Sequence, residues 1–327
     1  MVSLRRSLLL LGLCLVMASL ASAQTPAFQC VANAGVPPLV RAEGLTELVG
    51  DLVLNCNNGT ATAAGSPVPQ VNVRIFLNTN VTSRLVATGW NESFLIIDEP
   101  DTLNLRLCTS ITGCPEVGVA PGAPPAPGTG PGINYKTDPT VENVYQGQPT
   151  AGTANQVDYI GVPIDPPGTA TTRIIRITNV RANANQLGVA TTLIPTQIQM
   201  FVSITGATSI PVNNPQQIVA FVVPGLNFSV TGGGTNTQCL SGSRAIQLNY
   251  QERFATAFKR RSYQQDQTTV AIQNIVGFIY NTETGFYHPT FPSGTGANVA
   301  GRASQGTRLR AVFTGVQAGT LDRKSVV

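Results

Sequence analysis

Apolar and polar residues alternate along several short stretches of the chain. In residues 71–77 the odd positions are all aliphatic and the even positions are mostly polar. The same alternation appears at residues 103–107 and at residues 198–204. Because successive side chains of a strand point to opposite faces of a sheet, this pattern predicts strands with one buried face and one solvent-facing side.

Shorter runs rich in β-branched and aliphatic residues add further strand candidates, most of them bounded by Gly, Pro or Asn. They cover residues 47–54, 94–97, 174–180, 217–223, 268–280 and 308–316. Many short strands separated by turn signals are typical of antiparallel sandwiches. The pattern therefore predicts an all-β protein built from antiparallel β-sandwiches.

One stretch departs from the period-two pattern, because residues 243–276 contain neither Gly nor Pro. Four apolar residues recur there at helical spacing, namely Tyr250, Phe254, Ala257 and Phe258. Asn249 with Glu252 fits a capping box, and the cations at 259–261 complement the C-terminal end of a helix dipole. We therefore expect one short helix near 249–261. Its basic end is either an interaction surface or, as we favour, the ordinary end of a helix that covers the sandwich.

The composition and the first residues narrow the class of protein. Charged residues make up 11% of the chain, whereas 32 Gly and 23 Pro are present, which excludes a coiled coil and a helical bundle. Residues 1–23 have a basic start, an apolar run and Ala-Ser-Ala before Gln24, as in a secretory signal peptide. We expect a secreted protein, extracellular or at the cell surface, with no transmembrane segment. Loss of Arg5 and Arg6 lowers the formal net charge from +4 to +2, so no nucleic-acid partner is indicated.

Five cysteines remain after the expected signal peptide. In an oxidising compartment, nearest-neighbour pairing joins Cys30 to Cys56 and Cys108 to Cys114. Cys239 is left over, either as a buried, inert thiol or as half of an intermolecular disulfide. The chain has no C-x-x-C pair and a single histidine, so we expect no metal ion held by the cysteines.

A segment rich in Pro and Gly at residues 115–132 interrupts the strand candidates. It fits neither a helix nor a sheet ladder, and structureless segments of this length are uncommon inside compact domains. It therefore predicts a linker between an N-terminal, disulfide-containing sandwich at 24–114 and a second β-sandwich region at 133–327. A run of three glycines predicts a further division near 232–239.

The acidic stretch after residues 94–97 resembles the Walker B segment of ATPases, but the chain contains no Gly-Lys pair for a phosphate loop. Asp98, Glu99 and Asp101 are instead candidate calcium ligands in a turn after a strand, with a solvated acidic turn as the favoured interpretation. A Ser-His-Asp triad would need the single His288, and no G-x-S-x-G motif is present. We expect no cofactor and no enzymatic activity.

Aromatic residues near predicted turns are candidates for ligand contact. Trp90, Phe286 and Tyr287 offer flat rings to a sugar or a partner, whereas such residues more often cap a sandwich core. Asn-x-Ser/Thr sequons are candidate glycan acceptors in a host that glycosylates them, and they lie at Asn58, Asn80, Asn91 and Asn227.

Two blocks, residues 30–34 with 39–56 and residues 176–184, resemble segments of secreted bacterial proteins that have immunoglobulin-like sheets. No activity is assigned to that group. The resemblance implies export and tandem antiparallel immunoglobulin-like β-sandwiches, and it transfers no site residues to this chain.

Taken together, these features favour a non-catalytic extracellular or cell-surface structural protein, such as a filament or matrix subunit that assembles through sheet edges. An unpaired strand can accept a segment from a neighbour, and residues 308–316 or the mature N-terminus near Gln24 are the candidate donors. The alternative is a secreted carbohydrate- or ligand-binding β-sandwich module that uses the aromatic residues. A third possibility is a secreted hydrolase with two carboxylates brought together by the fold.

Overall fold

The computed structural model describes residues 26–101, 103–119, 132–189, 195–206, 209–233, 246–260, 283–286, 288, 301–303 and 306–314. Within these ranges the secondary structure consists of 18 strands and one 3-10 helix, η1 (Ala184–Gln186), with no α-helix. Twelve of the strands form two six-stranded sheets. The predicted all-β class is therefore confirmed.

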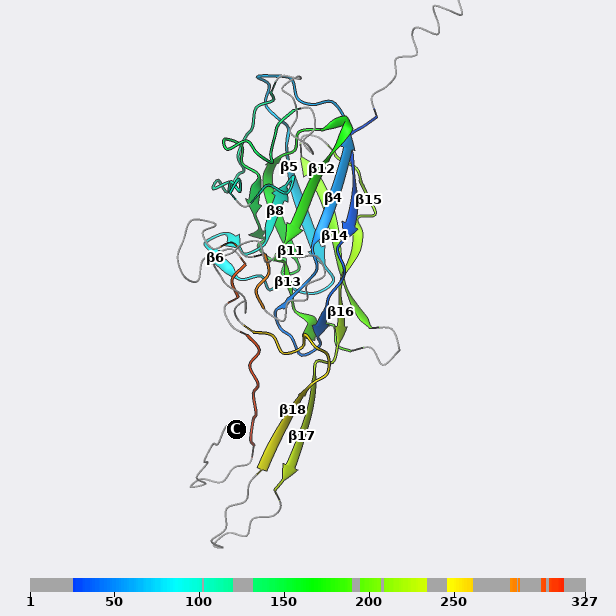
Figure 1. Cartoon of the computed structure of the whole chain (residues 1–327), viewed down its shortest axis with the longest axis vertical. Helices are drawn as coiled ribbons and strands as arrows, with labels where there is room; N and C mark the ends of the chain where they lie inside the picture. Colours follow the sequence, from blue (N-terminus) through cyan, green and yellow to red (C-terminus); the bar gives the residue numbers. More distant parts are fainter. Residues whose placement is uncertain are drawn as a thin grey trace, which may run out of the picture.

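The first sheet has the strand order β15-β1-β4-β12-β8-β9 (Figure 1). Its strands are β1 (Gln29–Ala34), β4 (Leu52–Asn58), β8 (Phe94–Ile97), β9 (Val144–Gln146), β12 (Gly168–Thr178) and β15 (Val212–Asn213). All neighbours are antiparallel except β1 and β15, which run parallel. The short strands β15 and β9 form its two edges.

The second sheet has the strand order β10-β11-β5-β14-β16-β2. Its strands are β2 (Leu39–Arg41), β5 (Gln70–Leu77), β10 (Gln148–Pro149), β11 (Gln156–Pro163), β14 (Thr196–Gly206) and β16 (Gln216–Val223). Only β16 and β2 run parallel. Three two-stranded sheets complete the fold, and they pair β3 (Glu47–Leu48) with β13 (Arg181–Ala182), β6 (Leu85–Ala87) with β7 (Trp90–Asn91), and β17 (Leu226–Gly232) with β18 (Ile246–Glu252).

Side chains from both large sheets meet in one apolar core, as in a β-sandwich. Leu54 and Ile175 of the first sheet and Ile75 of the second are fully buried in the same cluster. Along β5 buried and partly exposed residues alternate at every position, as the sequence pattern predicted. The strands expected at 71–77, 94–97 and 198–204 are therefore confirmed.

The strand expected at 103–107 is wrong, although the alternation there is clear. Leu103 is 86% exposed, and Leu107 forms only an isolated bridge to Val144. A turn closed by a hydrogen bond from the Asn104 amide to the Asp101 carbonyl (2.8 Å) occupies the start of this stretch. The turn takes Leu103 away from a ladder, so alternation alone does not create a strand. The stretch expected at 268–280 lies outside the described residues.

The structure contains the disulfides Cys30–Cys56 and Cys108–Cys114, the pairing expected from nearest neighbours. Cys30 and Cys56 lie directly opposite each other on the antiparallel strands β1 and β4 and are fully buried. The second bridge closes a loop between β8 and β9. Cys239 lies outside the described residues.

The boundary expected at 115–132 does not separate two sandwiches. Strand β12 pairs with both β4 and β8, and β11 pairs with β5, so strands from either side of this segment share each sheet. The first part of the segment also packs on the sandwich, since Val117 forms a bridge to Pro67. A Pro/Gly-rich composition indicates an irregular backbone. It does not by itself indicate a domain boundary, because strands after the segment pair with β4 and β5, which precede it. The tandem arrangement is therefore replaced by one sandwich. The boundary expected near 232–239 lies mostly outside the described residues.

The helix expected near 249–261 is wrong, because residues 246–252 form strand β18 and pair with β17 over seven residues. The stretch also alternates, since Ile246, Leu248 and Tyr250 are separated by polar residues. The complementary strand β17 is present, and its ladder pairs the backbone N–H and C=O groups that would otherwise form hydrogen bonds within a helix. Residues 253–258 form bends and turns, and Arg261 lies outside the described residues. No helix within the described ranges has the length and apolarity that crossing a membrane requires.

Candidate interaction surface

The β17–β18 hairpin, called the arm below, projects away from the sandwich (Figure 1). The register places Phe228 opposite Tyr250 and Val230 opposite Leu248, so these four side chains share one face. The rings of Phe228 and Tyr250 contact each other with centroids 5.1 Å apart. Phe228, Val230 and Ile246 are 51%, 53% and 52% exposed. The arm therefore carries an apolar face that the described part of the chain leaves largely uncovered.

A second extended element, residues 306–314, begins near the base of the arm. Thr307 is anchored there: its amide donates to the Lys259 carbonyl (2.8 Å), and its hydroxyl accepts from the Lys259 amide (2.8 Å) and the Arg41 guanidinium (2.9 Å). Residues 308–314 then belong to no strand of the described chain. Leu309, Val312 and Phe313 are 48%, 66% and 59% exposed. As far as residue 314, the predicted strand at 308–316 is thus an extended segment that pairs with no described strand (Figure 1).

The base of both elements is a buried ionic cluster centred on Glu47. This carboxylate is fully buried and pairs with Arg41 (2.5 Å) and Lys259 (2.9 Å). Burial disfavours its charged form, but Lys259 and Arg41 together outweigh that effect and hold the pKa of Glu47 below its ordinary value. Because Lys259 comes from the chain that follows the arm, this ion pair fixes the arm to the sandwich.

The cluster extends to Glu283, which contacts Arg41 (3.1 Å) and Arg181 (3.5 Å). Arg181 also pairs with Glu92 (2.8 Å). Burial raises the pKa of Glu283, although Lys259 opposes the rise. These side chains come from positions far apart in the sequence, so the cluster joins the C-terminal part of the chain to both β3 and β13. The cation Lys259, expected at a helix terminus, is instead a buried structural ion.

The acidic residues after β8 are partners of arginines in the structure. Asp98 and Arg173 form an ion pair that is almost completely buried, and Asp98 also accepts from the Ile174 amide (2.9 Å). Burial raises the pKa of Asp98, while Arg173 opposes the rise. Glu99 pairs with Arg176 (3.3 Å). The pair of Asp98 with Arg173 thus belongs to the sandwich interior.

The third acidic candidate, Asp101, is exposed. Nowhere in the described residues do three or more His, Cys, Asp or Glu side chains gather in a group that would hold a metal ion. The structure therefore brings Asp98 and Glu99 to arginines and does not bring the three candidate calcium ligands together around one point.

The aromatic candidates lie at different places. Trp90 is half-buried in strand β7, next to the turn at Gly89, which has φ +80. Phe286 packs edge-on against Phe94 (6.5 Å between centroids), and the Arg176 guanidinium lies 5.9 Å from its ring. Phe286 thus covers the end of a small apolar cluster, while Tyr287 lies outside the described residues.

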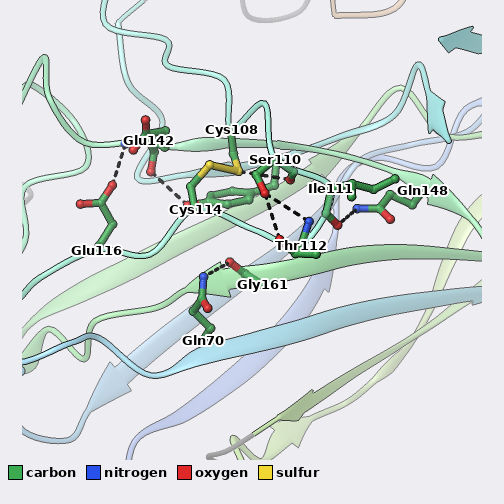
Figure 2. Close-up of a disulfide and its surroundings, with 11 residues drawn as sticks. Gln70, Cys108, Ser110, Ile111, Thr112, Cys114, Glu116, Glu142, Gln148 and Gly161 are labelled. Atoms are coloured by element: carbon green, nitrogen blue, oxygen red, sulfur yellow. Dashed lines mark hydrogen bonds between the residues drawn. A yellow bond between two sulfur atoms is a disulfide. The ribbon is translucent and has the colours of Figure 1, made fainter. Parts of the chain in front are cut away.

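A pair of glutamates lies beside the Cys108–Cys114 disulfide, as Figure 2 shows. The Glu142 amide donates to the Glu116 carboxylate (3.0 Å). Partial burial and the neighbouring Glu142 raise the pKa of Glu116 to about 7.

The disulfide loop itself is fastened to the second sheet (Figure 2). Gln148 donates to the Ile111 carbonyl (2.9 Å), and Gly113 lies against Gly161 of β11. A Cβ on Gly113 would lie 2.3 Å from the Gly161 carbonyl oxygen, so only glycine permits this approach. The loop is therefore part of the packed sandwich.

No protein-family model, curated protein or solved structure matches the chain. The interpretation of the surface therefore rests on its geometry. Sequence reasoning missed the arm, although residues 226–231 alternate apolar and polar without exception (Leu226-Asn227-Phe228-Ser229-Val230-Thr231). That alternation was the available signal. No signal was available for the ionic cluster, since Glu47 and Lys259 are separated by 212 positions.

Proposed function

We propose that the protein is a non-catalytic, secreted structural protein, extracellular or at the cell surface, built on an immunoglobulin-like β-sandwich. It associates with copies of itself through exposed elements that the described part of the chain leaves uncovered, as a filament or matrix subunit does. The two disulfides support an oxidising compartment.

The arm together with residues 306–314 is the observation that carries this proposal. Exposed strands with apolar side chains are templates for pairing with another chain, and proteins that stay monomeric normally blunt or cover them. Here the two elements are fixed at their base by a buried ionic cluster, so they are held in place for a contact.

The use of ionisable groups supports a structural role. Buried carboxylates such as Glu47, Asp98 and Glu92 each form an ion pair with a cation of the fold. Such pairs fix the position of segments that are distant in the sequence. The sandwich is in this view a rigid carrier for the exposed strands.

Light scattering of the purified full chain over a range of concentrations tests the proposal, together with electron microscopy of the secreted material. We expect a molar mass that rises above that of one chain, and regular assemblies in the micrographs. A Trp90→Ala variant should assemble like the unchanged protein. If the protein were instead a module that binds a carbohydrate or another ligand through Trp90, this variant would lose that binding. A molar mass of one chain at every concentration would contradict the proposal.

A further inference from the structure

The arm is amphipathic like the sandwich strands, but the described part of the chain leaves its apolar face largely uncovered. The register of β17 and β18 places apolar side chains on one face, with a single glutamate, Glu252, at its base. That face presents Leu226, Phe228, Val230, Ile246, Leu248 and Tyr250. The opposite face carries Asn227, Ser229, Thr231, Gln247, Asn249 and Gln251.

Such an element is incomplete by itself. An isolated two-stranded hairpin is marginally stable in water, and an amphipathic sheet needs a second layer over its apolar face. Within the described chain the exposures of Phe228, Val230 and Ile246 show that this layer is missing. Because the apolar face carries almost no charge, it selects an apolar surface and not an ionic partner.

We infer that the partner is a second copy of this chain, whose arm packs apolar face to apolar face against the first about a two-fold axis. The inference rests on the proposed self-association and names the surface that produces it. A two-fold contact uses the same patch on both copies, which suits a face that is apolar throughout. Each arm then supplies the layer that the other lacks.

The exposed area of the arm fits a weak, concentration-dependent contact. An aromatic side chain covers about 150–250 Å2 and an aliphatic one somewhat less, so the half-exposed apolar face of one arm amounts to on the order of 400 Å2. Two arms packed together would bury ~800 Å2, which lies in the range of weak and transient interfaces, below about 1,200 Å2. Association should therefore depend on concentration.

Two variants separate the two faces of the arm. Val230→Glu places a carboxylate on the apolar face, and Ser229→Glu places the same group on the neighbouring residue of the polar face. Sedimentation equilibrium of the full chain should show association weakened at least ~100-fold by Val230→Glu, because the carboxylate must be desolvated in the dimer. Ser229→Glu should leave association unchanged, and both variants should keep the thermal midpoint of the dilute monomer.

A second measurement distinguishes a partner copy from cover by the same chain. Hydrogen exchange at the amides of β17 and β18 should slow as concentration rises through the association range. Exchange that is slow at every dilution would mean that the chain covers its own arm, and would overturn the inference.

The outcomes also separate this inference from the proposed function. If the unchanged protein and Val230→Glu associate equally, the arm is not the interface, while self-association stands. If the unchanged protein never associates, both the inference and the proposed function fail.

Discussion

Strand β5 in the sandwich and the arm carry the same alternation of apolar and polar residues, but only one of them is covered. Ile75 of β5 is fully buried, whereas Ile246 of β18 is 52% exposed. Strand β5 lies between β11 and β14 and faces the other sheet, while among the described strands β17 and β18 pair only with each other. Alternation therefore predicts a strand and its inner face, but not what covers that face.

The largest effect should come from the buried ion pair inside the sandwich. Asp98→Ala leaves the Arg173 guanidinium buried without its carboxylate, which costs about 3–5 kcal/mol in comparable cases. Chemical denaturation of the monomer should show this loss. Glu99→Ala, at the more exposed pair with Arg176, is the matched control and should cost less. Equal losses would mean that burial does not set the cost.

The comparison of β5 with the arm is tested most simply by truncating one isoleucine of each to alanine. Ile75→Ala should lower the free energy of unfolding by about 2–5 kcal/mol, because it leaves a cavity in the core. Ile246→Ala should lower that of the dilute monomer by less than about 1 kcal/mol, since half of the side chain is already in water. Denaturation curves at low concentration measure both. A large loss for Ile246→Ala would show that the monomer covers its arm.

Weakening the ionic cluster at the base of the arm should lower stability by an intermediate amount, and only near that base. Glu47→Gln removes the charge that Arg41 and Lys259 share, although Arg41 keeps Glu283 at 3.1 Å. We expect the free energy of local opening at the base to fall by about 1–3 kcal/mol. Hydrogen exchange should then be faster at the amides of Lys259 and Thr307, with the amides of β4 unchanged. Faster exchange throughout the sandwich would contradict a role confined to the base.

The smallest effect should be the pH dependence from Glu116. Its pKa is raised to about 7 in the folded protein, so the folded state binds the proton more tightly than the unfolded chain does. Its contribution to stability is therefore present below about pH 4.5 and is lost as the pH rises through about 7. Because Glu116 is partly exposed, the change should stay below about 1 kcal/mol.

Glu116→Gln checks the sign of that dependence. The variant should lose the fall in thermal midpoint between pH 4.5 and 7 that the unchanged protein shows. A steeper fall in the variant would contradict the assignment to this carboxyl group.

The sequence predicted the elements whose signal is local. Alternation located β5 and β14, and nearest-neighbour pairing of the cysteines located the disulfides of Cys30 with Cys56 and of Cys108 with Cys114. The helix expected near 249–261 failed because Tyr250 fits both a helical and a strand period, and the partner strand β17 decides between them. The choice depends on a pairing that no short window of sequence contains.

The sequence predicted one of the two elements of the candidate interaction surface, residues 308–316, but not the arm. Residues 308–316 were expected to be an exposed donor, and the described part, as far as residue 314, is extended and exposed. The ionic base was not visible, because Arg41, Glu47, Lys259 and Glu283 meet only after folding. The domain boundary at 115–132 failed for the same reason, since sheet order depends on contacts between distant strands.

Sedimentation equilibrium of three proteins decides whether the exposed arm joins copies of the chain. We expect association of the unchanged protein and of Ser229→Glu, and a single-chain mass for Val230→Glu at the same concentrations. Association of all three to the same extent, or of none, would contradict this role of the arm.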